Sequence, residues 1–207
     1  MLHNFPFDTC SLRADTVQAL ENTYAALSAK FNISVPDDIN LHINKFETIN
    51  INPDISVGGV LQINNTANEC YLAFVKIHNY YHSVRSGEDQ DFYQYKVWAF
   101  ITLKNDFGRI LIRRETFTDR IVNLIHPVEL KFPDDKVFSG KFYVVTNDEQ
   151  KALPAMNWNF RNTIMDMDDD IEMEALNHTL IISNNKNIDA EQTVQLAELA
   201  SKIAGIK

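Results

Sequence analysis

The sequence predicts an α+β fold: a largely antiparallel sheet, with a meander in the middle of the chain, packed by an N-terminal helix, a proline-interrupted helix and a C-terminal helix. Apolar residues recur at helical spacing near both ends of the chain, and aromatic and β-branched runs fill its middle. Strands also follow one another without the strand–helix alternation of a parallel sheet. A length of 207 residues and a hydrophobic content of 45% predict a single domain, 1–207, with its own core.

The first element is predicted to be a helix over residues 15–31. Its apolar residues recur three or four positions apart and form one stripe along the helix; they are Val17, Leu20, Tyr24, Leu27 and Phe31. Asp15 is expected to cap the N-terminus, and Gln18 completes a capping-box pattern. The stripe indicates packing against the core.

Strands are predicted in the middle of the chain. Residues 39–44 alternate between apolar and polar side chains, which is typical of a half-buried strand, and a short strand is expected over 60–63. Two longer runs, 70–84 and 92–104, are rich in aromatic and β-branched residues and flank a polar stretch, so they predict a hairpin. Residues 109–114 are expected to add the third strand of the meander.

The last third of the chain contains both element types. The predicted elements are a strand over 141–146, a helix that begins at Asn147 and is interrupted at Pro154, two paired strands over 171–175 and 179–183, and a last helix capped by Asp189.

Acidic residues outnumber basic ones by 28 to 19, so the formal net charge is -9. The densest acidic run contains Asp166, Asp168, Asp169, Asp170, Glu172 and Glu174, with Glu172 and Glu174 on the solvated outer face of a strand. These six residues are the candidate site for a basic protein partner, although the charge run by itself favours the other interpretation, a solvated surface that binds nothing. The same charge disfavours nucleic acid as a partner.

The two cysteines indicate the compartment. Cys10 and Cys70 lie sixty positions apart and match no zinc or disulfide spacing, so both are expected to be free thiols in a reducing environment. The N-terminus lacks the pattern of a signal peptide, and the apolar runs are far shorter than the roughly 20 residues that cross a bilayer. The sequence therefore predicts a cytoplasmic protein without membrane insertion.

Motifs for catalysis, metals and cofactors are absent from the sequence. There is no nucleophile elbow, P-loop or dinucleotide fingerprint. His78 and His82 have the spacing of zinc ligands on a helix, but their aromatic neighbours favour a strand, on which two such side chains lie about 13 Å apart. We therefore predict no catalytic residue, no metal site and no cofactor, although an enzyme whose site is assembled from scattered residues stays open.

The chain also resembles a bacterial domain family of unknown function, whose members are soluble or anchored by an N-terminal membrane helix. The resemblance spans about residues 68–204. It rests on the strands Asp91–Tyr95 and Arg109–Glu115, on Val128–Leu130 and Phe138–Asp148, on Ala152 and Leu153, on the strand pair Ile171–Ile182, and on the final helix from Asp189. It implies an α+β fold and a bacterial origin, with residues 1–67 specific to this protein, and it supplies no catalytic residues.

Two functional hypotheses follow from the sequence. The first is a non-catalytic protein-interaction domain, similar in role to immunity or chaperone-like proteins. The alternative is a domain that binds a small ligand or a lipid headgroup, or an enzyme, with a pocket built from Tyr93, Tyr95, Arg109 and Arg113. The sequence sets no oligomeric state.

Overall fold

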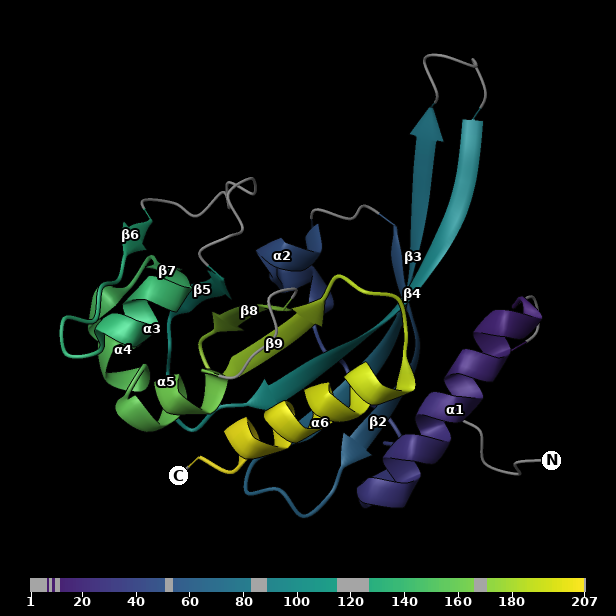
Figure 1. The fold of residues 1–207 in the computed structure, drawn as a ribbon, viewed down its shortest axis with the longest axis horizontal. Coiled ribbons are helices and arrows are strands. Elements are labelled where there is room, and N and C mark those ends of the chain that lie inside the picture. The colour runs from purple at the N-terminus through teal and green to yellow at the C-terminus, as the bar shows by residue number, and fades with distance from the viewer. Residues whose placement is uncertain are drawn as a thin grey trace.

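A computed structural model describes residues 7, 9, 12–50, 54–82, 89–114, 127–165 and 171–206 and confirms the predicted α+β class. Nine strands within these residues form one antiparallel sheet (Figure 1). They are β1 (Ile33–Ser34), β2 (Ile55–Ile63), β3 (Cys70–His82), β4 (Asp89–Thr102), β5 (Arg109–Arg114), β6 (Val128–Glu129), β7 (Phe142–Thr146), β8 (Ile171–Leu176) and β9 (Thr179–Asn184). Their spatial order is β1-β2-β3-β4-β9-β8-β5-β7-β6.

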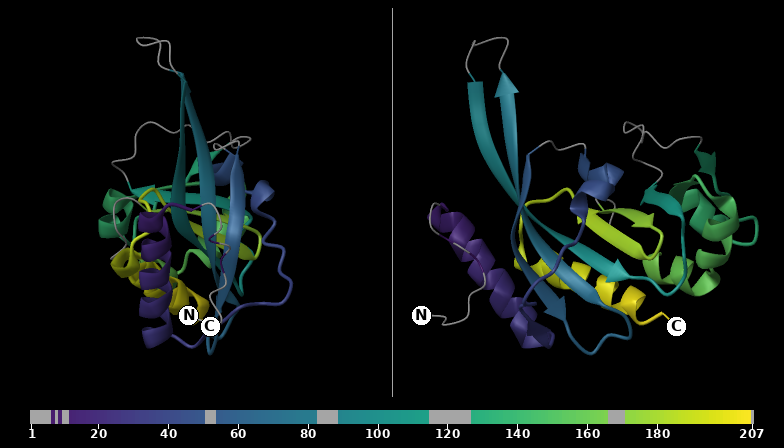
Figure 2. Two further views of the ribbon diagram at one scale, coloured as in Figure 1. Left: turned by 90° about the vertical axis from the view of Figure 1, so that its right-hand side faces the viewer. Right: turned by 180° about the vertical axis from the view of Figure 1, so that it is seen from behind.

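Helices cover both faces of the sheet (Figure 2). The helical segments are α1 (Ala14–Lys30), the 3-10 turn η1 (Ile43–Lys45), α2 (Glu47–Asn50), α3 (Lys136–Lys141), α4 (Glu149–Ala155), α5 (Trp158–Ile164) and α6 (Ala190–Ala204). The larger core lies where α1 and α6 pack on one face, here called the α1 face. A smaller core lies on the opposite α2 face, beneath η1 and α2. Among the helices of the described chain, none has both the length and the apolarity needed to cross a bilayer.

The hairpin of β3 and β4 projects beyond the rest of the sheet (Figure 1). Every residue of β3 pairs with one of β4, from Cys70 opposite Ile101 to His82 opposite Asp89. The neighbouring strands end earlier, because β2 follows β3 only as far as Ile77 and β9 follows β4 only from Ala99. The outer part of the hairpin therefore stands clear of the sheet that holds its base.

Two strand predictions need correction. β5 forms over the predicted residues but pairs with β7 and β8, so the third strand of the meander is β2. No strand forms over 39–44; η1 begins at Ile43, and Leu41 and Ile43 pack partly buried against the α2-face core. The alternating pattern was right about which side chains are partly buried, but an alternating segment becomes a strand only where a partner edge is available.

Helix ends follow the predicted capping chemistry in part. The Asp189 carboxylate accepts a hydrogen bond from the Gln192 amide, which confirms the predicted cap of α6. In α4 the cap is Asp148 rather than Asn147, and Pro154 lies in the last turn before a break. The helix predicted over 15–31 forms as α1, but its predicted cap is wrong: Arg13 occupies the cap position, and Asp15 lies inside the helix.

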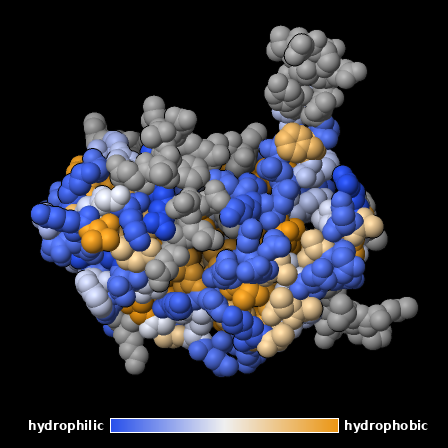
Figure 3. Space-filling view, viewed as in Figure 1, coloured by the Kyte–Doolittle hydropathy of each residue, from blue (hydrophilic) through white to orange (hydrophobic). Residues whose placement is uncertain are grey.

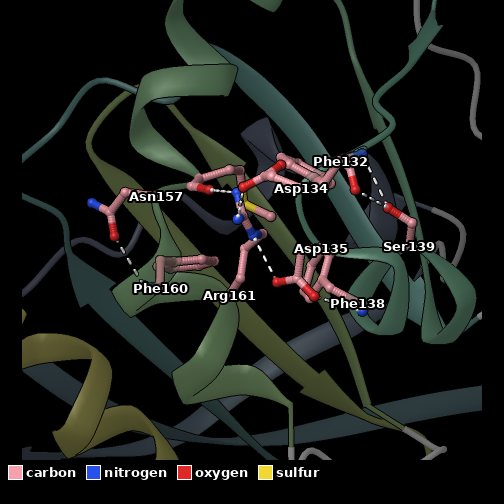
Figure 4. Close-up of polar contacts among 9 residues, drawn as sticks. Phe132, Asp134, Asp135, Phe138, Ser139, Asn157, Phe160 and Arg161 are labelled. Atoms are coloured by element: carbon pink, nitrogen blue, oxygen red, sulfur yellow. Dashed lines mark hydrogen bonds and ion pairs between the residues drawn. The ribbon is translucent and has the colours of Figure 1, made fainter.

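A buried arginine ties α5 to the chain segment that precedes α3 (Figure 4). The Arg161 guanidinium donates to Asp134 at 2.7 Å, to Asp135 at 3.2 Å and to the Met156 carbonyl at 3.0 Å. It also lies 4.7 Å from the ring centroid of Phe132. Because the side chain is almost fully buried, these contacts replace its lost hydration and fix the helices at this end of the sheet.

Replacing Arg161 with Met should lower the free energy of unfolding by about 2 kcal/mol, measured by urea denaturation. The effect is smaller than for a fully buried pair because Asp134 is exposed and its charge is screened by water. The matched control is Arg13→Met, which removes an ion pair to Asp15 whose partners are both exposed, and it should change stability by less than about 0.5 kcal/mol. Equal effects of the two substitutions would contradict the role assigned to Arg161.

Candidate functional site

Two of the predicted pocket residues, Tyr93 and Tyr95, lie at the base of the projecting hairpin. Side chains alternate across a strand, and Val97 and Ala99 of β4 belong to the larger core. Tyr93 and Tyr95 therefore point to the α1 face. Tyr93 is 49% exposed, whereas Tyr95 is partly covered.

The other two predicted pocket residues, Arg109 and Arg113, point to the opposite face. Ile112 of β5 points into the larger core, and side chains alternate between the two faces along a strand. The side chains of Arg109 and Arg113 therefore point to the opposite face, towards α2. The Arg109 guanidinium donates to Glu47 at 2.8 Å and to the Lys45 carbonyl at 2.7 Å, which ties β5 to η1 and α2. The structure therefore brings the two tyrosines together but does not bring the arginines to them.

His78 joins the tyrosines on the α1 face of the hairpin. Its Nδ1 lies 2.7 Å from an Asp54 carboxylate oxygen, and its Nε2 contacts the carboxylate of Asp91. The imidazole stacks on the Tyr93 ring at 4.7 Å between centroids, and the Lys76 ammonium lies 4.0 Å from the centroid of the same ring. The hydrogen bond to Asp54, followed by that to Asp91, raises the pKa of His78 above its usual value.

The sequence analysis considered His78 only as a metal ligand and missed both carboxylates. Asp91 could have been found from the hairpin itself, because β3 and β4 pair across a polar turn and place Asp91 diagonally opposite His78. Asp54 carries no such signal, since it precedes β2 and reaches His78 only through the sheet order.

An open hollow of about 490 Å³ lies between the base of the hairpin and the N-terminal half of α1. Its walls are Arg13, Asp15, Thr16 and Ala19 on one side and Asp91, Phe92, Tyr93, Tyr95, Asn187 and Ile188 on the other. The Arg13 guanidinium is paired with Asp15 at 2.7 Å. Charged, hydroxyl and aromatic groups thus converge on one concave surface, which is the arrangement that ligand and partner sites use.

A second groove, of about 470 Å³, opens on the α2 face. It lies between residues 38–46 and the ends of β3, β4 and β8, and its polar groups include His42, Lys45, Glu69 and His178. No group of three histidine, cysteine or carboxylate side chains in the described chain is arranged to hold a metal ion. Cys70 is a buried free thiol, and burial raises its pKa to about 12.

The acidic residues predicted to bind a partner are not one exposed surface. Glu174 is only 2% exposed, and Glu172 is also buried, so the expectation of a solvated outer face is wrong for both. β8 is an interior strand covered on both faces, and the Glu174 carboxylate accepts from the Thr48 amide and hydroxyl at 2.9 and 3.0 Å. Burial raises the pKa of Glu174. Asp166, Asp168, Asp169 and Asp170 lie outside the described residues.

Comparisons with known proteins give one result about the fold. No protein-family model and no curated protein matches the sequence. Among solved structures, the chain is similar to the crystal structure of the mycobacterial trehalose monomycolate transport factor A, TtfA, with a TM-score of 0.56 and 9% identity. The alignment covers 93% of this chain and 94% of that chain. The likeness shows a shared fold, and membership of the bacterial family named above stays a prediction.

The effect of the two carboxylates on the pKa of His78 can be tested by titration. Nuclear magnetic resonance of the imidazole should show a pKa above the usual 6.5, and Asp54→Asn together with Asp91→Asn should lower it. Since the folded-state pKa is the raised one, the stabilisation from these contacts is fully present below pH 6.5 and is lost as the pH rises through the folded-state pKa. A His78 pKa that the double substitution leaves unchanged would contradict the contacts.

Proposed function

We propose that this protein is a non-catalytic protein-interaction domain that binds a basic protein partner through its projecting hairpin. The observation that carries the proposal is the exposure of aromatic side chains on this element. Tyr80, Phe92 and Tyr93 are 65%, 46% and 49% exposed, and all three lie on the part of the hairpin that other strands do not flank. Figure 1 shows the outer parts of β3 and β4 standing clear of the body of the molecule, and in Figure 3 an orange-toned hydrophobic side chain lies on the surface where the hairpin leaves that body.

The hairpin has the properties of a recognition element. Tyrosine and phenylalanine supply large contact area at low conformational cost, and such residues are enriched in interfaces. The contacts of His78 with Asp54, Asp91 and Tyr93 hold the base of the hairpin in one arrangement. A two-stranded hairpin has little stability of its own, so contact with a partner would stabilise it further.

Charge supports a basic partner. The net charge of -9 attracts cationic proteins, and Asp166, Asp168, Asp169 and Asp170 remain in the proposal as residues that steer the encounter. Basic side chains also stack well on exposed tyrosine rings, as Lys76 does on Tyr93 within this chain. Glu172 and Glu174 have no part in the interface, because they are buried.

Two further considerations support a binding role over catalysis. The polar arrangement around His78 uses both imidazole nitrogens in contacts with carboxylates, so neither nitrogen is placed to activate a nucleophile. The structural neighbour is named as a transport factor, which is in keeping with a role in binding. The cytoplasmic location and bacterial origin predicted from the sequence remain part of this proposal.

Substitution of Tyr80 tests the proposal against a matched control. Once a partner is identified by affinity capture, calorimetry should show that Tyr80→Ser weakens binding by about tenfold or more, since exposed aromatic anchors dominate such interfaces. Trp158→Ser removes an aromatic residue of nearly equal exposure, 64%, at the far end of the sheet, and should leave the affinity unchanged. Equal affinities of the two variants, or a loss only for Trp158→Ser, would place the interface elsewhere.

Salt tests the charge of the partner. Association should slow as ionic strength rises from 0.1 M to 1 M, because the screening length falls from about 10 Å to about 3 Å. Asp168→Asn, Asp169→Asn and Asp170→Asn combined should slow association at low salt without changing the urea midpoint. A partner whose stopped-flow association rate responds to neither change is not recognised through its basic charge.

A further inference from the structure

A cavity of about 140 Å³ lies beneath Leu20 of α1 and the segment before this helix, beside the hollow at the hairpin, and its wall is largely apolar but also includes Ser56, Lys76 and Lys96. Phe7, Leu12 and Leu20 form its roof, and Phe74 of β3 forms part of its floor. Its size is close to that of a cavity of about 150 Å³ that binds benzene. An apolar group of similar size is therefore the occupant that this cavity favours.

The cavity and the hollow are neighbours that share two wall residues, Tyr95 and Ile188. The Ile188 amide donates to the Tyr95 carbonyl at 2.7 Å, so these two residues form a fixed boundary between the spaces. The cavity side of this boundary is largely apolar and carries Lys76 and Lys96, whereas the hollow side carries Arg13, Asp15 and the Tyr93 ring. A molecule that spans both spaces needs one apolar end and one polar end.

A cation lies where the two spaces meet. Lys76 lines the apolar cavity, and its ammonium rests 4.0 Å from the centroid of the Tyr93 ring, which lines the hollow. Within the described part of the chain, this ammonium makes no ion pair with a carboxylate, whereas Arg13 is paired with Asp15. The charge at the junction is thus free to bind an anionic group.

We propose that the cavity and the hollow together bind a single-chain amphiphile with an anionic headgroup. The apolar end lies between α1 and Phe74, and the headgroup lies against Lys76 and Tyr93. This site is additional to the proposed protein-binding surface of the hairpin, with which it shares Tyr93. An extended peptide suits it less, because the Tyr95 carbonyl is already hydrogen bonded to Ile188 and the polar groups that face the hollow come largely from side chains.

Octanoate, 1-octanol and octyltrimethylammonium test the proposal, because they share one chain length and differ in their headgroups. In two-dimensional amide spectra, octanoate should shift the signals of Leu20, Tyr95 and Ile188 and should bind more tightly than the other two probes. Lys76→Met keeps the aliphatic stem and removes the charge, so it should weaken octanoate binding by about fivefold and leave octanol binding unchanged. Lys141→Met, an exposed lysine on α3, is the matched control and should change neither affinity.

Leu12→Phe reduces the volume of the cavity and should weaken all three probes by about tenfold. Lys76→Met keeps the test decisive if this variant folds poorly. Tyr80→Ser should bind octanoate as tightly as the unsubstituted protein does. A failure of the amphiphile proposal can therefore be told apart from a failure of the protein-binding proposal. Octanoate shifts confined to the α2-face groove, equal affinity for the three headgroups, or tighter binding of a phenylalanine-centred tripeptide at Leu20 and Tyr95 would each overturn the proposal.

Discussion

The continuous pairing of β3 with β4 is the constraint on which the rest of the structure depends. Because every residue of β3 has a partner in β4, the register assigns each side chain of the hairpin to one face of the sheet. That register sends Val97 and Ala99 into the larger core under α1 and α6, and it sends Trp98 and Phe100 into the smaller core under α2. It also continues past the neighbouring strands and carries His78 and Tyr93 to the base of the projecting tip. A shift of one residue would exchange the two faces and destroy both cores.

Buried polar groups hold one end and the centre of the sheet in place. At one end, Arg161 connects α5 to Asp134 and Asp135. Near the centre of the sheet, Glu174 accepts hydrogen bonds from Thr48, while Arg109 reaches Glu47 and the Lys45 carbonyl, so α2 is fastened to β5 and β8. Burying these charges is unfavourable in itself, and the hydrogen bonds offset that cost only when each partner is in position. The short helices α2 and α5 are thereby fixed in one arrangement.

The sequence predicted the local elements well because local signals determine them. The Asp189 cap, the break at Pro154 and the long hairpin all depend on residues close together in the chain. The order of the strands depends on pairing between distant segments, so the position of β5 was not predictable from its neighbours in sequence. The same limit applies to the site. Alternation along β4 puts Tyr93 and Tyr95 on one face, and alternation along β5 puts Arg109 and Arg113 on one face. Only the pairing of the strands within the sheet shows that these two faces are opposite.

The burial of Glu172 and Glu174 also could not be predicted from local sequence patterns. Alternation showed that Glu172 and Glu174 share one face of a strand, and charge suggested that this face is solvated. The structure covers it with α2, which supplies hydrogen-bond donors to Glu174. Whether a face is covered depends on an element more than a hundred residues away, and no local pattern carries that information.

Nuclear Overhauser contacts measured in solution test most directly whether the hairpin register sorts the candidate site onto one face. The structure predicts cross-peaks between the rings of Tyr93 and His78, whose centroids lie 4.7 Å apart. It predicts none between either tyrosine, Tyr93 or Tyr95, and the side chains of Arg109 or Arg113. Cross-peaks between a tyrosine ring and either arginine, or the absence of contact between Tyr93 and His78, would contradict this arrangement.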